Sequence, residues 1–255
     1  MKKIYVLIRP KSGISIKERM MKEVFQSPAF NRVRELNPDF LAFINEKVEA
    51  VEGDISDDRL IFNEEKRLEI AQSCHFIINN AASIDFNLRL DLAIQINFYG
   101  PRRLMKLAKE CPHLIAFTHV STCYANSHKT GAYVEEKIYE QADDPDGVIE
   151  ELLKMPVQAL IDNNDKLIAP WPNTYTFTKF YSERSILKHQ GSLPILILRP
   201  SIIIASKKDP YPGWIDSLAA CGGLTSMIAL GIISHMDIPT HTRGDLIPVD
   251  YVSNQ

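Results

Sequence analysis

Short apolar runs alternate with longer amphipathic segments along most of this chain. The runs are rich in β-branched and aromatic residues, which is typical of buried strands, and the segments between them have the periodicity of helices. The expected strands span residues 4–8, 47–51, 75–78, 114–120 and 194–200, and the expected helices span 15–25, 32–45, 60–73, 90–110 and a stretch starting near 174. Strands that alternate with helices of this length pair in parallel, so the pattern predicts an α/β fold with a Rossmann-like, doubly wound parallel sheet.

Two stretches interrupt this alternation. Residues 129–171 are acidic and helix-forming, and they are interpreted either as a solvated helical insertion or as a lid over a substrate entrance. Residues 218–233 are apolar but shorter than the roughly 18 to 20 residues that span a bilayer, which favours a core or substrate-lining segment. Residues 1–255 are expected to form one domain.

The composition is that of a soluble globular protein. Of the 255 residues, 45% are hydrophobic and 24% are charged, and the net charge is −3. Scattered basic residues and a slightly negative charge argue against nucleic acid as a partner. The four cysteines have no metal-ligand spacing, and no signal-peptide pattern follows Met1, so we expect reduced thiols in an intracellular protein.

The clearest candidate for chemistry is the pair Tyr175 and Lys179, four residues apart. On a helix this spacing places both side chains on one face. An adjacent ammonium is expected to lower the pKa of the phenol, which suits a proton donor to a developing alkoxide. The pair therefore indicates reduction of a ketone or aldehyde, and the alternative is a plain surface helix.

A second pair with the same spacing, Tyr133 and Lys137, shows that the spacing alone is weak evidence. Tyr175 follows a helix start at Asn173 and precedes a strand, whereas Tyr133 lies among glutamates with no strand-like run behind it. This context favours Tyr175 as the catalytic residue.

Polar residues at predicted strand ends suit a nucleotide cofactor. Arg9 ends the first strand, where an arginine accepts the 2′-phosphate of NADP, so the sequence predicts NADPH; the alternative is an arginine that only covers the strand end. Asp54 ends the second strand and suits a hydrogen bond to the adenine amino group, or it caps a following helix.

The ends of the next two strands carry small and hydroxyl residues. Ala81 and Ala82 permit close approach of a cofactor, although small residues also allow a helix to pack on a strand. Thr122, with Ser121 as a substitute, could donate a hydrogen bond to a substrate carbonyl, or the two could simply form a turn. Asn97, on an apolar helix face, requires hydrogen-bond partners and is either a structural tie or a direct participant.

Together these residues resemble a fatty acyl-CoA reductase of the extended short-chain dehydrogenase/reductase superfamily. The resemblance covers the whole chain and is carried by VSTCYAN, NTYTFTK, GDI, NNAA, LRPSII and GDLIPVDYVSN. It implies NADPH-dependent reduction of a long-chain acyl-CoA to the alcohol through a bound aldehyde. The residues it implies are Thr122, Tyr175 and Lys179 for catalysis, and Arg9, Asp54, Ile55, Ala81, Ala82, Lys179, Pro200 and Ser201 for cofactor binding.

The chain departs from that family at both ends. The family's first strand and its TGxxGFxG turn, which hold the pyrophosphate, do not occur, so we expect a fragment without its central strand. The first two strands are then expected to be separated from the next three, and the chain as written to bind NADPH weakly. The family's helical C-terminal region is also absent, and only through it would the protein contact a membrane, at the peroxisome or endoplasmic reticulum.

Two alternatives to an acyl-CoA reductase follow from the same residues. One is another extended short-chain reductase or epimerase that acts on a nucleotide sugar or a flavonoid-like ketone. The other is a catalytically inactive fragment that binds partners or lipid. The acidic insertion and the apolar residues 218–233 favour a long apolar substrate.

Overall fold

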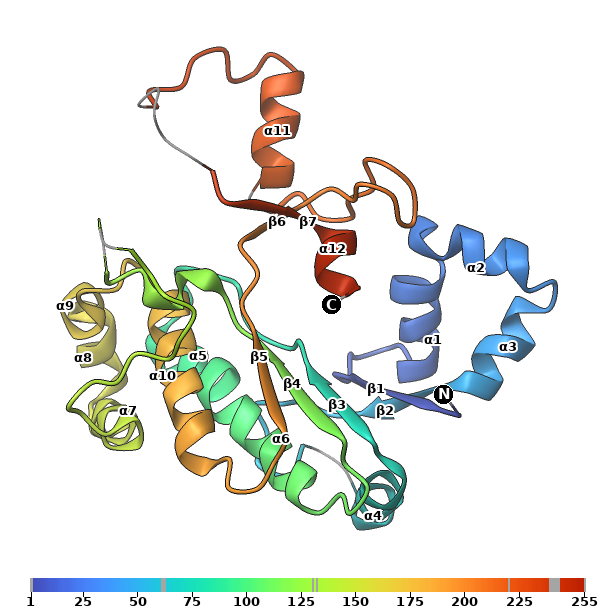
Figure 1. Cartoon of the computed structure of the whole chain (residues 1–255), viewed down its shortest axis with the longest axis horizontal. Coiled ribbons are helices and arrows are strands. Elements are labelled where there is room, and N and C mark those ends of the chain that lie inside the picture. Colours follow the sequence, from blue (N-terminus) through green and yellow to red (C-terminus); the bar gives the residue numbers. More distant parts are fainter. Residues whose placement is uncertain are drawn as a thin grey trace. The chain divides into compact units, whose positions relative to one another are not determined.

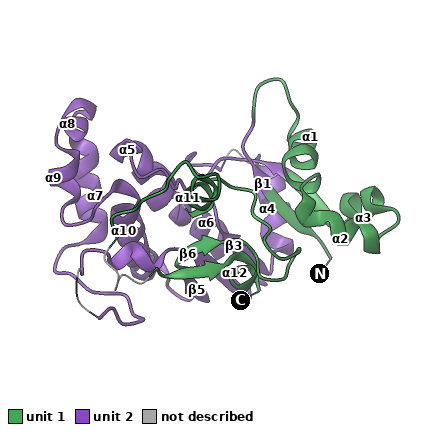
Figure 2. Ribbon diagram, turned by 90° about the horizontal axis from the view of Figure 1, so that it is seen from above, with its two compact units in different colours: residues 1–6, 11–50, 200–255 green, residues 7–10, 51–199 purple. Residues whose placement is uncertain are grey.

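The computed structural model describes residues 2–60, 63–129, 131, 133–219, 221–238 and 244–254. The contacts of the chain form two compact units (Figure 2). The first unit comprises residues 1–6, 11–50 and 200–255, and the second unit comprises residues 7–10 and 51–199. The sequence predicted one domain, and the contacts resolve the chain into these two units. Among the described residues, no helix is long and apolar enough to cross a membrane.

The described strands form three small sheets. The first pairs β1 (Ile4–Ile8) with β2 (Val48–Glu52), the second has the order β3 (Phe76–Asn79), β4 (Ala116–Val120), β5 (Ile195–Leu198), and the third pairs β6 (Ile202–Ile204) with β7 (Leu246–Pro248). The second and third sheets are parallel. The five strands expected from the sequence are present within two residues of their predicted starts, and the expected separation of the first two strands from the next three is confirmed.

The parallel sheet β3-β4-β5 organises the second unit (Figure 1). Its covering helical elements are α4 (Glu64–Ser73), α5 (Leu90–Ala93), η3 (Ile94–Tyr99), α6 (Gly100–Lys109) and α10 (Thr174–His189). Phe117 and His119 of β4 are fully buried, whereas Phe76, Ile78 and Leu196 of the alternate positions are 58%, 72% and 54% exposed. Side chains alternate between the two faces of a strand, so one face of this sheet is covered and the other carries exposed apolar side chains.

Residues 90–110 form the continuous helical stretch that the sequence predicts. Its middle, η3, is a π-helix between α5 and α6. Ile94 and Phe98 of this segment are fully buried. The helix packs on α10, which is how the segment supports the element that carries Tyr175.

The acidic insertion is part of the hydrophobic core of the second unit. It contains α7 (Pro145–Lys154), α8 (Val157–Asp162) and α9 (Asn164–Ile168), which Figure 1 shows beside α10. Ile149, Leu160 and Trp171 are buried in one cluster with Phe177 and Phe180 of α10. The interpretation as a solvated insertion is therefore wrong for residues 145–171, while the lid stays a prediction.

Two aspartates of this insertion are paired with side chains of α10. The carboxylate of Asp143 accepts hydrogen bonds from Arg184 at 3.0 Å and from the Tyr181 hydroxyl at 2.9 Å. Asp146 is 8% exposed and accepts a hydrogen bond from Ser185 at 2.9 Å. Buried carboxylates of this kind need such partners, so the acidic composition reflects attachment to α10.

The first unit contains the remaining helices. Apart from η4 (Cys123–Asn126) of the second unit, they are α1 (Ile16–Met20), η1 (Met21–Phe25), η2 (Pro28–Phe30), α2 (Asn31–Leu36), α3 (Phe40–Lys47) and, after β6, α11 (Cys221–Ala229) and α12 (Val249–Ser253). The helix predicted over residues 32–45 is divided at Asn37, whose backbone is extended with φ −126° and ψ 94°. The cause is Pro38, because a proline disfavours the helical conformation in the residue before it. Asp39 then caps α3 by accepting a hydrogen bond from the backbone of Ala42.

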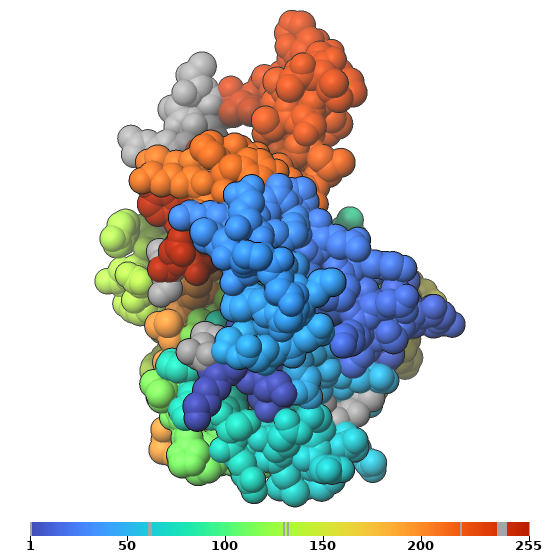
Figure 3. All heavy atoms as spheres, turned by 90° about the vertical axis from the view of Figure 1, so that its right-hand side faces the viewer, coloured from blue at the N-terminus to red at the C-terminus, as the bar shows by residue number. Residues whose placement is uncertain are grey.

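The apolar segment 218–233 is largely on the surface. Leu218, Leu230 and Ile232 are 75%, 75% and 68% exposed, and only Gly222 of α11 is buried among the described residues. The space-filling view shows this orange-red segment with much of its surface uncovered (Figure 3). The prediction of a core segment is wrong, because apolar composition alone does not say whether a partner element covers it.

Candidate functional site

Tyr175 and Lys179 lie on the first two turns of α10. The helix begins as predicted: the side chain of Asn173 accepts a hydrogen bond from the backbone N–H of Thr176 at 2.9 Å. Lys179 is only 3% exposed. The competing Tyr133 is 89% exposed, and residues 133–144 contain no helix, so its four-residue spacing from Lys137 brings nothing together.

Thr122 meets Tyr175 just beyond the carboxyl end of β4. The Thr122 oxygen caps the short 3-10 helix η4 (Cys123–Asn126) by accepting a hydrogen bond from the backbone N–H of Tyr124 at 3.2 Å. Its own hydroxyl lies near enough to the Tyr175 hydroxyl to affect the pKa of that phenol. The structure thus brings the two hydroxyl groups together at a strand end.

Burial raises the pKa of Tyr175, and the hydrogen bond from Thr122 opposes this rise. The expectation that Lys179 lowers the pKa of the phenol is therefore wrong in this structure. The Lys179 ammonium lies 6.0 Å from the centre of the Tyr175 ring, and it donates a hydrogen bond to the backbone oxygen of Val120 at 2.7 Å. Tyr175 accordingly remains a neutral phenol at pH 7 with a proton to donate.

Lys179 itself is strongly affected by its surroundings. Burial lowers its pKa to about 8, and the charge of Glu183 partly opposes the shift. A desolvated ammonium favours its neutral form because the protein interior stabilises charge less than water does. Lys179 is still mostly protonated at pH 7, which leaves a charged donor beside the two hydroxyl groups.

A buried ion pair fixes α10 to the end of β5. Glu183 is 1% exposed, and both its oxygens accept hydrogen bonds from Arg199, at 2.9 Å and 2.6 Å. In the sequence, Arg199 stands out only as part of the LRPSII motif at the end of the strand over residues 194–200. Charge four residues after Lys179 on the same helix was the signal that could have revealed this pair.

A second buried polar pair, also missed from the sequence, lies in the sheet below the site. His119 of β4 is 1% exposed, and its Nδ1 is 3.0 Å from the side-chain nitrogen of Asn79 in β3. Burial first, and then the charge of Lys179, lower the pKa of His119 well below its ordinary range. His119 is therefore a neutral ring at pH 7, and alternation within β4 was the only sequence feature that marked it as buried.

Asn97 ties α10 to the loop that follows β3. Its side-chain oxygen accepts a hydrogen bond from the backbone N–H of Ser83 at 2.8 Å, and its nitrogen donates to the Ser83 oxygen and the Thr178 hydroxyl, both at 3.1 Å. Phe86 of the same loop stacks on Tyr175 with ring centres 5.7 Å apart. The structural role foreseen for Asn97 agrees with these contacts, although the tie reaches the catalytic helix and not the strand.

We expect Asn97→Ala to lower the free energy of unfolding by about 1.5 to 3 kcal/mol, because it removes several buried hydrogen bonds and leaves the Ser83 backbone without a partner. Urea denaturation measures this change. Asn87→Ala, at an exposed position in the same loop, is the control and should change stability by less than about 0.5 kcal/mol. Equal stability of the two variants would contradict the assignment.

Two of the predicted cofactor residues lie at adjacent strand ends. Arg9 directly follows β1 and is exposed, and Asp54 follows β2; the strands stay paired up to the hydrogen bond from Gly53 N–H to the Ile8 oxygen at 3.0 Å. A Cβ on Gly53 would lie 2.5 Å from the backbone oxygen of Leu60, which explains the glycine of the GDI motif. Arg9 and Asp54 therefore lie at the strand ends where the sequence predicted them. Their binding of a cofactor stays a prediction.

Neighbouring contacts refine this picture. The Asp54 carboxylate accepts hydrogen bonds from the backbone N–H and the hydroxyl of Ser56, at 2.8 Å and 2.7 Å, so it forms a turn and not the helix cap considered as an alternative. Ile55 is buried, and its backbone oxygen accepts a hydrogen bond from Arg103 at 3.0 Å. The Ile55 side chain is thus part of the core in the described structure.

The other predicted cofactor residues are less constrained. Ala81 is exposed and Ala82 half-buried, both in the loop after β3. Pro200 is buried and Ser201 half-buried, and both belong to the first unit, directly before β6. Their contacts with a cofactor stay predictions.

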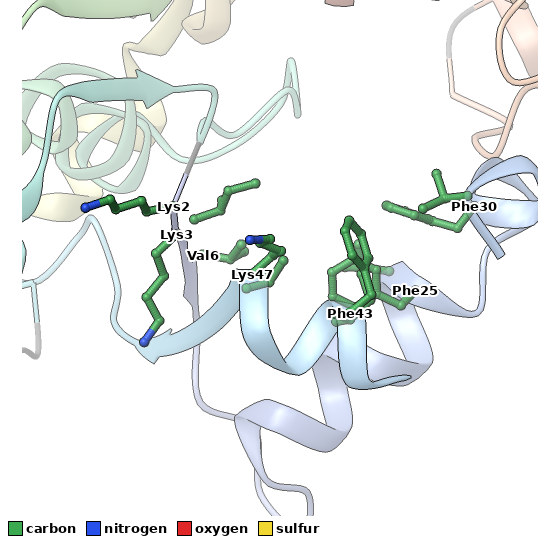
Figure 4. Close-up of a pocket in the computed structure, with 12 residues that line it drawn as sticks. Lys2, Lys3, Val6, Phe25, Phe30, Phe43 and Lys47 are labelled. Atoms are coloured by element: carbon green, nitrogen blue, oxygen red, sulfur yellow. The ribbon is translucent and has the colours of Figure 1, made fainter. Parts of the chain in front are cut away.

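A separate cavity of about 430 Å³ lies in the first unit. Figure 4 shows Val6, Phe25 and Phe43 gathered around it, and its lining residues belong to β1 and the residues directly before it, η1, η2, α2, α3 and β2. The walls are almost entirely apolar, with the lysines contributing their aliphatic stems. The residues that line it include no candidate catalytic or cofactor-binding residue.

Metal chemistry has no support in the described part of the chain. No group of three or more histidine, cysteine, aspartate or glutamate side chains is arranged there to hold an ion. The candidate site offers two hydroxyl groups and one ammonium group for chemistry.

Comparison with known proteins identifies the family of this chain. A family model described as "Male sterility protein", an NAD-binding domain, matches residues 1–255. Fatty acyl-CoA reductase 1 of Mus musculus is 36% identical over 251 residues, which are 98% of this chain and 47% of that protein. Fatty acyl-CoA reductase 2 of Bos taurus is 31% identical over 254 residues, which are 100% of this chain and 48% of that protein. The chain spans about half the length of the curated relatives it matches.

The fold also matches solved structures. The terminal R domain from the myxalamid PKS-NRPS biosynthetic pathway aligns with a TM-score of 0.63 at 21% identity, over 99% of this chain and 54% of that one. At this identity the likeness shows the fold alone, and it confirms the Rossmann-like α/β architecture predicted from the alternation of strands and helices.

Proposed function

We propose, because this chain belongs to the male sterility protein family of NAD-binding domains, that it reduces long-chain fatty acyl-CoA to the fatty alcohol through a bound aldehyde. A nicotinamide cofactor follows from the family, and NADPH is the form we propose. The observation that carries the proposal is the proximity of the Thr122 and Tyr175 hydroxyl groups, with Lys179 one helical turn away from Tyr175. The relatives named as fatty acyl-CoA reductases supply the substrate class.

The three side chains have distinct tasks in this reaction. The cofactor supplies the hydride. Thr122 and Tyr175 donate hydrogen bonds to the carbonyl oxygen of the substrate, where negative charge develops, and so stabilise it. The electron pair on that oxygen then re-forms the carbonyl group while the thioester C–S bond breaks, so that the CoA thiolate leaves and the aldehyde stays bound.

Tyr175 completes the second reduction. When the aldehyde oxygen becomes an alkoxide, the neutral phenol transfers its proton and yields the alcohol. The raised pKa of Tyr175 keeps this proton in place at neutral pH before the reaction. Lys179, still mostly charged at pH 7, is the residue we propose to hold the cofactor beside these two hydroxyl groups.

The direct test incubates the purified protein with NADPH and a long-chain acyl-CoA and measures NADPH oxidation together with aldehyde and alcohol. We expect alcohol as the final product. Thermal unfolding with NADPH distinguishes an inactive fragment, which would not bind the cofactor, from an enzyme, because a ligand specific to the native state raises the melting temperature. Binding without product would contradict the proposed activity, and absence of both would support the inactive alternative.

We further propose that Arg9 selects NADPH over NADH. A charge-assisted hydrogen bond to the 2′-phosphate is worth about 1.5 to 3 kcal/mol, or roughly ten- to a hundredfold in affinity. Arg9→Asp should therefore reverse the preference, as measured by titrating both cofactors against the melting temperature. An unchanged ratio of the two affinities would show that the arginine serves another purpose.

A further inference from the structure

Cys74 and Cys111 end two helices that lie side by side in the second unit. Cys74 is the residue after α4, and Cys111 follows α6 by two residues. Each helix then leads into a strand, β3 or β4, and these strands are neighbours. The turns that carry the two thiols are thus held by the same pair of strands.

Further contacts fix these two turns to each other. The backbone N–H of Ile115 donates a hydrogen bond to the His75 oxygen at 2.7 Å. The rings of His75 and His113 stack with their centres 5.9 Å apart. The residue directly after Cys74 therefore contacts the turn that follows Cys111.

The two thiols are in side-chain contact there. With both thiols protonated, Cys74 donates a hydrogen bond to the backbone oxygen of Phe76 at 3.3 Å and Cys111 donates one to that of Leu107 at 3.2 Å. When Cys74 is ionised, the Cys111 thiol is close enough to donate its proton to the Cys74 sulfur instead. Cys74 is half-buried, whereas Cys111 is 7% exposed. A reagent in solution can thus reach Cys74 first.

The contact makes the two thiols unequal in acidity. The hydrogen bond from Cys111 lowers the pKa of Cys74 to about 7, and the same bond raises the pKa of Cys111. A thiolate is the nucleophile in disulfide exchange, and it is most effective when its pKa is near the ambient pH. Cys74 therefore has the properties of an attacking thiol, and Cys111 those of the thiol that completes the exchange.

We propose that Cys74 and Cys111 form a reversible intramolecular disulfide by exchange with a low-molecular-weight disulfide such as glutathione disulfide. The Cys74 thiolate attacks one sulfur of the reagent, breaks its S–S bond and releases one thiolate. Cys111 then loses its proton to solvent and attacks the Cys74 sulfur, which releases the second thiolate. The two cysteine thiols lose two electrons, and the reagent gains them as two thiols after protonation.

The bond would join the C-terminal ends of α4 and α6, before the starts of β3 and β4. Thr122 and Tyr175 lie beyond the opposite, carboxyl end of β4. We therefore expect the disulfide to raise the melting temperature by several degrees, since a cross-link restricts the unfolded chain, and to leave the candidate site unchanged. This inference does not depend on the proposed function.

The test treats the native full chain with glutathione disulfide at pH 7, then unfolds it and counts thiols. The chain has four cysteines, so formation of the bond leaves two thiols. Peptide mapping should show Cys74 linked to Cys111, and dithiothreitol should restore all thiols. Cys111→Ser should stop at a mixed disulfide between glutathione and Cys74.

Matched variants decide whether the pair is specific. The Cys221→Ser variant, changed in the first unit, should form the Cys74–Cys111 bond at the same rate as the unchanged protein. In the Cys74→Ser variant, Cys111 should not be linked to any other cysteine. The inference is overturned if native Cys74 carries glutathione while Cys111 stays reduced, if the link joins two chains, or if neither thiol reacts before Cys221.

Discussion

Replacing Tyr175 with phenylalanine is expected to lower turnover of acyl-CoA on the order of a hundred- to ten-thousandfold, the usual contribution of a general acid. The variant keeps the ring that stacks on Phe86 at 5.7 Å and loses only the hydroxyl that is hydrogen-bonded to Thr122. Stability should fall by about 0.5 to 1.5 kcal/mol, the value of one hydrogen bond. NADPH oxidation and thermal unfolding of the same preparation measure the two effects.

Tyr133→Phe is the matched control for this substitution. It removes the same hydroxyl from a residue with the same spacing to a lysine, but at a side chain that is 89% exposed and outside any helix. Its activity and stability should equal those of the unchanged protein. Activity of Tyr175→Phe at the same level would exclude Tyr175 as the proton donor.

The comparison of these two tyrosines shows what a sequence can predict. The spacing to a lysine is identical, and only the flanking residues separate the two pairs. Asn173, with the right side chain to cap a helix, and the strand that follows identified the correct pair, and the structure contains both features. Local rules suffice where a helix end or a buried strand is encoded by adjacent residues.

Features that depend on distant partners were predicted poorly. Residues 143–146 look solvated because three of the four are aspartates, yet Arg184 and Ser185, about forty positions away, bind their carboxylates. Residues 218–233 look buried because they are apolar, yet the structure leaves Leu218 and Leu230 exposed. In both cases burial is decided by elements that the local pattern does not reveal.

The same distinction applies to the candidate site. The positions of Thr122, Tyr175 and Lys179 follow from a strand end and a helix face, which the sequence encodes locally. The acidity of Tyr175 does not follow from the local sequence, because burial raises its pKa although the spacing brings a lysine near it. The ion pair of Glu183 with Arg199 joins α10 to a different element, so the local spacing of Glu183 to Lys179 does not identify its partner.

Replacing Lys179 with methionine is expected to lower turnover on the order of a hundredfold or more, and yet to stabilise the protein at pH 7. The ammonium is the charged donor beside Tyr175, and removing one such donor typically costs about 10²- to 10³-fold in rate. Burial lowers the pKa of Lys179 from 10.5 to about 8, which corresponds to about 3 kcal/mol of unfavourable free energy when the side chain is charged. Loss of the hydrogen bond to the Val120 oxygen offsets part of this, so the net gain should be about 1 to 2 kcal/mol.

The pH dependence gives this prediction its sign. Below pH 8 the lysine is charged in both the folded and the unfolded chain, and the folded state bears the full cost of burial. Between pH 8 and 10.5 the folded state binds fewer protons than the unfolded state, so the stability of the unchanged protein rises with pH relative to the variant. Urea denaturation at pH 7 and pH 10 should show the advantage of Lys179→Met shrinking, whereas Lys109→Met, at an exposed position on α6, should show no such difference. A variant less stable than the unchanged protein at pH 7 would mean that the contacts of Lys179 outweigh the cost of burying its charge.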